Sequence, residues 1–338
     1  MRIFIRNVTA FIADAKRFYQ TAMATKLVPL PDVERISPTV IRILGCNPGK
    51  VLQRIVQILR LDLIADGLNS SLFKVHEASG GLKDCSPGTG TNTYLIGQGT
   101  RRILIDTGEG KPEWLKLIKD TLSSEKATLD KVIVTHWHSD HIGGVKDVAT
   151  LSPKPAVYKS QMDEAQGLEE IKDGQTFEVE GATIHAFHCP GHTKDHMAFI
   201  LEEEDAMFTG DNVLGHGTAV FEDLSTYMNS LEKMSHLVAG RGYPGHGAVI
   251  GDCKAKIIEY IEHRKMREKE VIEVLRGGIE GGLGPMDLVK VIYQDVPENL
   301  HVAAAKGVVQ ILEKLAGEGK AHHNRETDTW TLNRKAVL

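Results

Sequence analysis

Short apolar runs that end in polar turns recur through the central part of the chain. Val132-Ile133-Val134 is β-branched and bounded by polar residues, while residues 182–188 alternate between apolar and polar positions. A third run, residues 206–208, ends in Thr209-Gly210. Runs of this kind predict short strands. The loops after them are where open α/β architectures place their active sites.

The pattern changes to helical spacing near the C-terminus. Residues 254–275 carry apolar side chains on one face, and the charged stretch 262–265 predicts a strongly solvated opposite face. Further helices are expected over 286–293 and 301–315, followed by a strand-like 329–332. This order predicts a small winged-helix-like module. Its second helix holds Ala303-Ala304-Ala305 and few basic residues, which favours packing or shaping of a substrate site over reading of nucleic acid.

Composition limits the classes of protein to consider. The chain has 338 residues, 41% of them hydrophobic, which is enough for one large core and a smaller module. No segment is apolar for long enough to span a bilayer. A net charge of −5 gives no general attraction for nucleic acid. The four cysteines are scattered without paired spacing, so we expect reduced thiols and a cytoplasmic protein.

Residues 135–144 read THWHSDHIGG and bring His136, His138, Asp140 and His141 into one short loop. Imidazole nitrogens and carboxylate oxygens are donors that suit zinc and similar divalent metals. Four such side chains exceed what one tetrahedral ion collects from a single loop, so the loop predicts two metals. The alternative is a histidine-rich surface loop without a metal, and the remainder of the chain disfavours it.

Three further donors follow strand-like runs elsewhere in the chain. His192 and His246 each end a Pro-Gly-His turn, and Asp211 follows the glycine turn after residues 206–209. Any one of them alone would be an ordinary turn residue. Together with the histidine loop they predict a metal site assembled from several strand ends.

With Asp106 in the sequence Ile105-Asp106-Thr107-Gly108, these motifs resemble those of the metallo-β-lactamase-fold hydrolases. The resemblance implies an α+β fold, namely an αββα sandwich followed by the winged-helix-like module. It also implies two Zn²⁺ ions per chain, with Asp211 bridging them and Asp106 holding the ligand loop by hydrogen bonds. One zinc would be bound by His136, His138 and His192, and the other by Asp140, His141 and His246.

Such a site predicts hydrolysis, because two dications lower the pKa of a shared water and polarise the bond to be cleaved. Asp140 is the expected catalytic residue, orienting the nucleophile and helping to protonate the leaving group. No serine elbow, P-loop or dinucleotide motif competes with it. His216 lies five residues beyond Asp211 in a glycine-flanked loop. It either touches substrate or an oxygen atom of a residue that hydrogen-bonds a metal ligand, or it is a structural loop residue.

The resemblance extends beyond the metal motifs. Residues 35–45, 90–95 and 211–224, with the C-terminal module, resemble the β-lactamase-like protein 2 group, and most of all the lactamase-type thioesterases of fungal aromatic polyketide clusters. This implies an enzyme that releases a polyketide acid by metal-hydroxide attack on its thioester. Its partners would be an acyl carrier protein of a polyketide synthase and a small-molecule acyl substrate. The alternative is the activity of the animal members, zinc-dependent cleavage of single-stranded RNA, which the acidic balance disfavours.

The expected organisation is an N-terminal extension at 1–32, a catalytic domain at 33–252 and the helical module at 253–338. Within the domain, residues 51–88 depart from the family as an insertion, either a lid or a segment absent from the mature protein; we favour the second. Residues 1–22 are basic and nearly free of acids. They are either a mitochondrial presequence, which would place the protein in mitochondria, or an over-extended gene model.

Overall fold

The computed structural model describes residues 30–47, 90–160, 167–278, 281–294, 298 and 301–333. Residues 1–29 of the predicted extension and the whole predicted insertion 51–88 lie outside these ranges. Among the described residues, no helix combines the length and apolar character that crossing a bilayer requires.

The first of two large sheets has seven strands in the order of the sequence. The first four strands pair antiparallel, and β4 through β7 are parallel to one another. The parallel part aligns the carboxyl ends of β4 and β5 at the same edge. The strands are β1 (Val33–Arg35), β2 (Val40–Leu44), β3 (Asn92–Ile96), β4 (Arg101–Ile105), β5 (Thr128–Val134), β6 (Ala156–Lys159) and β7 (Glu169–Glu170).

The second sheet has five strands in the order β12-β11-β10-β9-β8. Neighbours pair antiparallel except for β11 and β12, which are parallel. As a result β9, β11 and β12 all run in the same direction, and their carboxyl ends share one edge. The strands are β8 (Thr176–Val179), β9 (Ala182–His188), β10 (Met197–Leu201), β11 (Ala206–Gly210) and β12 (Gly242–Pro244).

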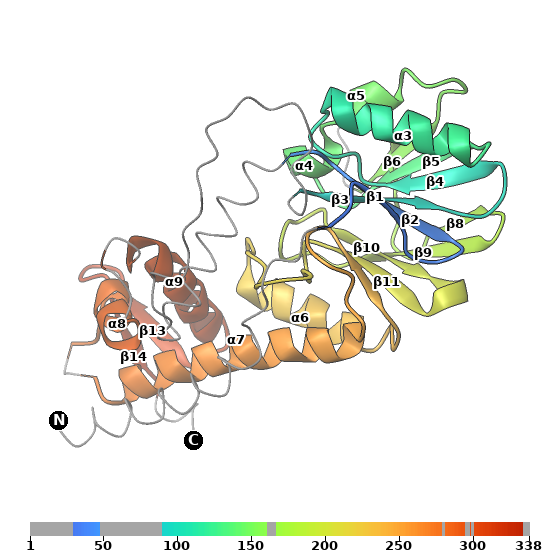
Figure 1. The fold of residues 1–338 in the computed structure, drawn as a ribbon. Coiled ribbons are helices and arrows are strands. Elements are labelled where there is room, and N and C mark those ends of the chain that lie inside the picture. The colour runs from blue at the N-terminus through green and yellow to red at the C-terminus, as the bar shows by residue number, and fades with distance from the viewer. Residues whose placement is uncertain are drawn as a thin grey trace.

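Alternating side chains divide the apolar core into layers. In β4, Ile103 and Ile105 join the cluster between the two sheets, whereas Leu104 joins the cluster under α3 (Pro112–Ser124). The helix contributes the wholly buried Trp114 and Ile118 to that outer cluster. This period of two is what a strand buried on both faces requires. Figure 1 shows α3 and the short α5 (Val145–Val148) lying on the outer face of the first sheet.

Two helices cover the outer face of the second sheet, α6 (Leu224–Ser235) and α7 (Cys253–Arg276). Each begins at an aspartate whose carboxylate accepts a backbone hydrogen bond in the first turn, Asp223 from Thr226 and Asp252 from Ala255. Such caps stabilise a helix by about 1 kcal/mol. The predicted αββα sandwich is therefore confirmed. Two further short elements are α4 (Ser139–Ile142) and the 3₁₀ helix η3 (Glu202–Glu204).

The C-terminal module contains α8 (Pro285–Ile292), α9 (His301–Gly317) and a hairpin of β13 (Ala321–Asn324) and β14 (Thr329–Leu332). This is the predicted winged-helix arrangement. Its apolar residues belong to the same buried cluster as those of α6 and α7. In Figure 1, α7 runs along the base of the sandwich and reaches the module, so the two parts share a helix and a core.

Two expectations from the sequence are wrong in detail. Glu262 and Lys265 of α7 are exposed as predicted, but His263 is buried, and so is the ion pair of Arg267 with Glu270 at 3.0 Å. Tyr293, directly after α8, packs against Arg267 with its ring centroid 5.7 Å from the guanidinium carbon, so the C-terminal module covers this part of α7. The helical spacing alone leaves it to solvent.

The cysteines also differ from the expected set of reduced thiols. Cys189 and Cys253 are free and buried, and Cys189 lies close to His192 in the sequence. Cys46, however, is disulfide-bonded. Spacing along the sequence could not indicate it, because the pairing depends on tertiary contact.

Candidate metal centre

The strand directions of both sheets bring all seven predicted metal donors to one place. His136 and His138 follow β5, and Asp140 and His141 lie on α4 directly behind them. The other three donors follow the aligned ends of β9, β11 and β12 and are His192, Asp211 and His246. The parallel strands of each sheet thus deliver their loops to a common edge.

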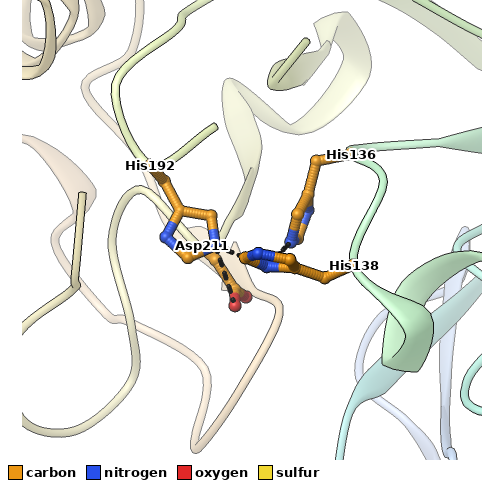
Figure 2. A group of neighbouring side chains, drawn as sticks. All are labelled: His136, His138, His192 and Asp211. Carbon is orange, nitrogen blue, oxygen red and sulfur yellow. Dashed lines mark hydrogen bonds and ion pairs between the residues drawn. The ribbon is translucent and has the colours of Figure 1, made fainter. Parts of the chain in front are cut away.

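The donors form two groups, within each of which the candidate ligand atoms lie within 4.8 Å of one another. The first group is His136, His138, His192 and Asp211, and the second is Asp140, His141 and His246. Figure 2 shows the three imidazoles of the first group pointing toward one another from two separate loops, with Asp211 beside them. His136 Nε2 and His192 Nε2 each lie 3.0 Å from His138 Nδ1.

In His136 and His192 of the first group, a hydrogen bond made by Nδ1 determines that Nε2 is the nitrogen with the available lone pair. His192 Nδ1 donates to the carbonyl oxygen of Val220 at 2.7 Å. Thr135 Oγ1 donates to the carboxylate of Asp106, so it accepts from His136 Nδ1 at 2.9 Å. Both Nε2 atoms therefore carry lone pairs, and the single proton of His138 cannot serve both. Converging lone pairs of this kind suit a cation.

The second group is held in the same manner. Asp106 Oδ2 accepts from His141 Nδ1 at 2.7 Å, and the carbonyl oxygen of Gly90 accepts from His246 Nδ1 at 3.3 Å. The Nε2 atom of each ring then faces the carboxylate of Asp140. His246 Nε2 lies 3.4 Å from Asp140 Oδ2, and His141 Nε2 lies 3.6 Å from the same oxygen. Carboxylate or carbonyl groups that orient a histidine in this way are typical of metal centres.

Asp211 joins the two groups. Its Oδ1 lies 3.4 Å from His141 Nε2, while its Oδ2 lies 3.6 Å from His192 Nε2 and 3.3 Å from His246 Nε2. Both His141 Nε2 and Asp211 Oδ1 are buried without a hydrogen-bond partner. Buried polar atoms are rarely left so, and a metal ion between them would satisfy both. The residues present fit a divalent metal in each group.

The histidines of the two groups differ in their charge at pH 7. Burial lowers the pKa of His136, His138 and His192, in the case of His138 to about 4, so these rings are neutral at pH 7. Burial also acts on His141 and His246, but neighbouring carboxylates, above all Asp211, outweigh it. They raise the pKa of His141 well above its usual range and that of His246 to about 10.

The two groups are therefore expected to bind metal with different dependence on pH. At pH 7 the metal-free protein carries protons on His141 and His246, and a metal must displace them, whereas the first group binds without proton competition. As pH falls below the raised pKa values, the second group should lose metal first. Calorimetric titration with Zn²⁺ in buffers of different ionisation enthalpy measures the protons released. His246→Ala is the matched control: it should lose the second metal, so the proton release of the second group should disappear with it. Equal pH dependence of both groups would contradict the assignment.

Several residues that support the site escaped the sequence analysis. Thr91 Oγ1 donates to Asp140 Oδ2 at 3.0 Å, and Thr135 links Asp106 to His136. His196 is buried and accepts from the backbone N–H of Asp211 at 3.1 Å. Thr135 adjoins the histidine loop and could have been noticed there. Nothing in the sequence marks Thr91 or His196, because their role depends on contacts between distant loops.

His216 belongs to neither group of donors. It is half-buried against Gly247, where a Cβ atom would lie 2.2 Å from His216 Nδ1, and that glycine adopts a φ of +88°. Burial lowers the pKa of His216 to about 4, and the charge of His246 adds to this effect. The neutral ring lies beside the His246 turn, and both interpretations of its role stay open.

Comparison with known families agrees with the fold and with the motifs. The family described as the metallo-beta-lactamase superfamily matches residues 86–246, and the beta-lactamase-associated winged helix domain matches residues 284–330. All seven donors fall within the first match.

Among curated proteins, the chain is 42% identical over 310 residues to an atrochrysone carboxyl ACP thioesterase of Aspergillus chevalieri, covering 89% of each chain. It is 41% identical over 313 residues to the atrochrysone carboxyl ACP thioesterase nsrC of Aspergillus novofumigatus, covering 89% of this chain and 86% of that one. The lactamase-like protein ptaB of Pestalotiopsis fici is also 41% identical over 311 residues, covering 89% and 88%.

A solved structure extends the likeness of fold through the C-terminal region. The beta-lactamase domain protein of Burkholderia ambifaria superposes with a TM-score of 0.66 at 13% identity, over 91% of this chain and 96% of that one. At this identity the comparison concerns the fold alone. The sequence relatives, the donor motifs and the αββα architecture agree, and the chain belongs to the metallo-beta-lactamase superfamily of hydrolases.

Proposed function

We propose that the protein is a dinuclear zinc thioesterase that releases an aromatic polyketide acid from its acyl carrier protein. The observation that carries the proposal is the pair of donor groups joined by Asp211 in a chain whose relatives are named ACP thioesterases. The donors are nitrogen and oxygen atoms that suit zinc. Two zinc ions would supply a nucleophile at neutral pH and polarise the carbonyl of the substrate.

Asp140 is the residue proposed to handle the proton. Burial raises the pKa of its carboxyl group, but the positive charge of His141 and the hydrogen bond from His246 outweigh it, so the pKa lies below its usual range. The carboxylate is therefore ionised and can accept a proton from the attacking water. Thr91 donates to Asp140 Oδ2, and Asn47 Nδ2 donates in turn to Thr91 Oγ1 at 3.0 Å, which fixes the carboxylate in place.

A thioester places modest demands on the acid. A thiol has a pKa near 8.5, so its thiolate leaves readily, unlike an alkoxide or an amide nitrogen. A carboxylate such as Asp140, which gives up its proton easily, is then sufficient to return that proton to the leaving group.

An aromatic side chain at the metal loop supports an aromatic acyl group. Trp137 lies between two predicted ligands, has 53% of its surface exposed, and its ring centroid is 4.5 Å from that of His138. Aromatic rings prefer stacked or edge-to-face partners and gain about 0.5–1.5 kcal/mol from them. The exposed Trp137 ring offers such a surface next to the site of hydrolysis.

The proposal predicts release of acid from an acyl carrier protein loaded with an aromatic polyketide chain. The full chain with zinc should hydrolyse this thioester, measured as loss of the acyl mass from the intact carrier protein. The chelator-treated protein is the control. Release no faster than in that control would sink the proposal, and metal-dependent cleavage of single-stranded RNA by the same sample would favour the ribonuclease alternative.

A further inference from the structure

The loop at residues 219–221 connects the C-terminal helices to the metal centre. Three consecutive carbonyl oxygens of this loop each accept a hydrogen bond from a different element. Ala219 accepts from Arg264 Nη2 of α7 at 2.8 Å, and Phe221 accepts from Gln310 Nε2 of α9 at 3.2 Å. Between them, Val220 accepts from Nδ1 of His192 at 2.7 Å. The carbonyl that orients His192 is thus bracketed by donors from two C-terminal helices.

Side-chain packing also holds this loop in place. The Phe221 ring stacks on Tyr227 of α6, with centroids 5.2 Å apart and planes at 16°. The guanidinium group of Arg264 lies over the Phe221 ring, 4.8 Å from its centroid. Tyr227 Oη in turn donates to the carbonyl of Asn212 at 2.5 Å, next to Asp211. One residue of α7 therefore contacts both the backbone and the aromatic ring of this loop.

The hydrogen bond from His192 to Val220 determines what His192 can do. With the proton fixed on Nδ1, Nε2 is left as the lone pair that faces His138 and Asp211. A carbonyl acceptor also raises the basicity of a ligand imidazole and sets the plane of its ring. Because a peptide plane is rigid, holding the carbonyls of Ala219 and Phe221 restricts how the Val220 carbonyl between them can rotate. Val220 itself is 43% exposed, so its own side chain is not clamped in the core.

We propose that Arg264 and Gln310 are positioning residues for the metal ligand His192. The winged-helix module then supports the metal centre, because Gln310 of α9, together with Arg264 of α7, holds the Val220 carbonyl that orients His192. The inference rests on metal binding within the proposed function, but it does not depend on the identity of the acyl substrate.

The decisive experiment uses Gln310→Met, which keeps the length of the side chain and removes its donor, in the full chain. Partner groups of metal-bound histidines typically change metal affinity by about 10–100-fold when lost. We expect the affinity for the metal bound by His136, His138 and His192 to fall by about tenfold. We also expect the visible absorption spectrum of the Co²⁺-substituted protein to shift. We also expect kcat to fall with little change in KM. Glu313→Gln, at an exposed position on the same helix, is the matched control. It should leave the metal affinity, the Co²⁺ spectrum and kcat unchanged.

Arg264 is tested separately, because its removal also uncovers the Phe221 ring. Arg264→Lys keeps the charge and one donor and should retain most of the affinity, whereas Arg264→Met should resemble Gln310→Met. Should Arg264→Met fail to fold, Gln310→Met alone decides. Metal affinity and Co²⁺ spectrum equal to wild type in a folded Gln310→Met protein would overturn the inference. If instead the wild type binds no metal through His192, the proposed function fails with it.

Discussion

Asp211→Ala is expected to deprive both donor groups of metal and to reduce hydrolysis to the level of the metal-free protein. Its two oxygens face His141 on one side and His192 and His246 on the other, so no other donor serves both groups in the described part of the chain. Removing it also leaves His141 and His246 without their main negative neighbour. Elemental analysis of the purified variant, together with thioester turnover, measures the effect.

His246→Ala is the matched control for this variant, since it removes one donor from the second group only. It should keep metal at His136, His138 and His192 and lose roughly one ion of two. An Asp211→Ala protein that retains both ions per chain would show that Asp211 does not bridge the groups. Circular dichroism on both variants separates loss of metal from loss of fold.

Asp140→Asn is expected to lower kcat by about 10²–10⁴-fold at saturating zinc, which is the usual contribution of a positioned general acid or base. Asparagine keeps the shape of the side chain and can still accept from Thr91, but it cannot take up a proton. The loss should therefore appear in kcat and not in the binding of the carrier protein. Stopped-flow or mass-spectrometric turnover at several zinc concentrations distinguishes this from weak metal binding.

Thr91→Val gives the matched comparison for Asp140. It leaves the carboxylate in place and removes the hydrogen bond to Oδ2, together with the one that Thr91 accepts from Asn47. The expected loss of kcat is therefore much smaller than that of Asp140→Asn. If Asp140→Asn hydrolysed thioester within tenfold of wild type at full metal occupancy, Asp140 would be a metal ligand without a role in proton transfer.

The arrangement around His192 gives the C-terminal module a physical role. It shares an apolar core with α6 and α7, and it supplies Gln310 to the loop that orients a predicted metal ligand. Shared cores of this kind make neighbouring parts of a chain fold and move together.

The sequence by itself predicted the strands β5, β9, β11 and β14, the helices of the C-terminal module and the seven candidate donor side chains. These follow from local signals, namely the period-two alternation of residues 182–188, the Pro-Gly-His turns and the crowded histidine loop. The donors could be recognised because histidine and aspartate are among the few side chains that bind metals, and because they occur in loops and turns that follow strand-like runs.

Only the tertiary structure decided what holds those donors. Val220 is 28 residues from His192, and Thr91 is 49 residues from Asp140. Nevertheless, Val220 orients His192 and Thr91 orients Asp140, each through one hydrogen bond. The buried Arg267–Glu270 pair of α7 likewise looks solvated until the C-terminal module covers it. Such contacts leave no local pattern, because a threonine hydroxyl or a backbone carbonyl looks the same along the chain whatever it touches. Their partners are set by the packing of the whole fold.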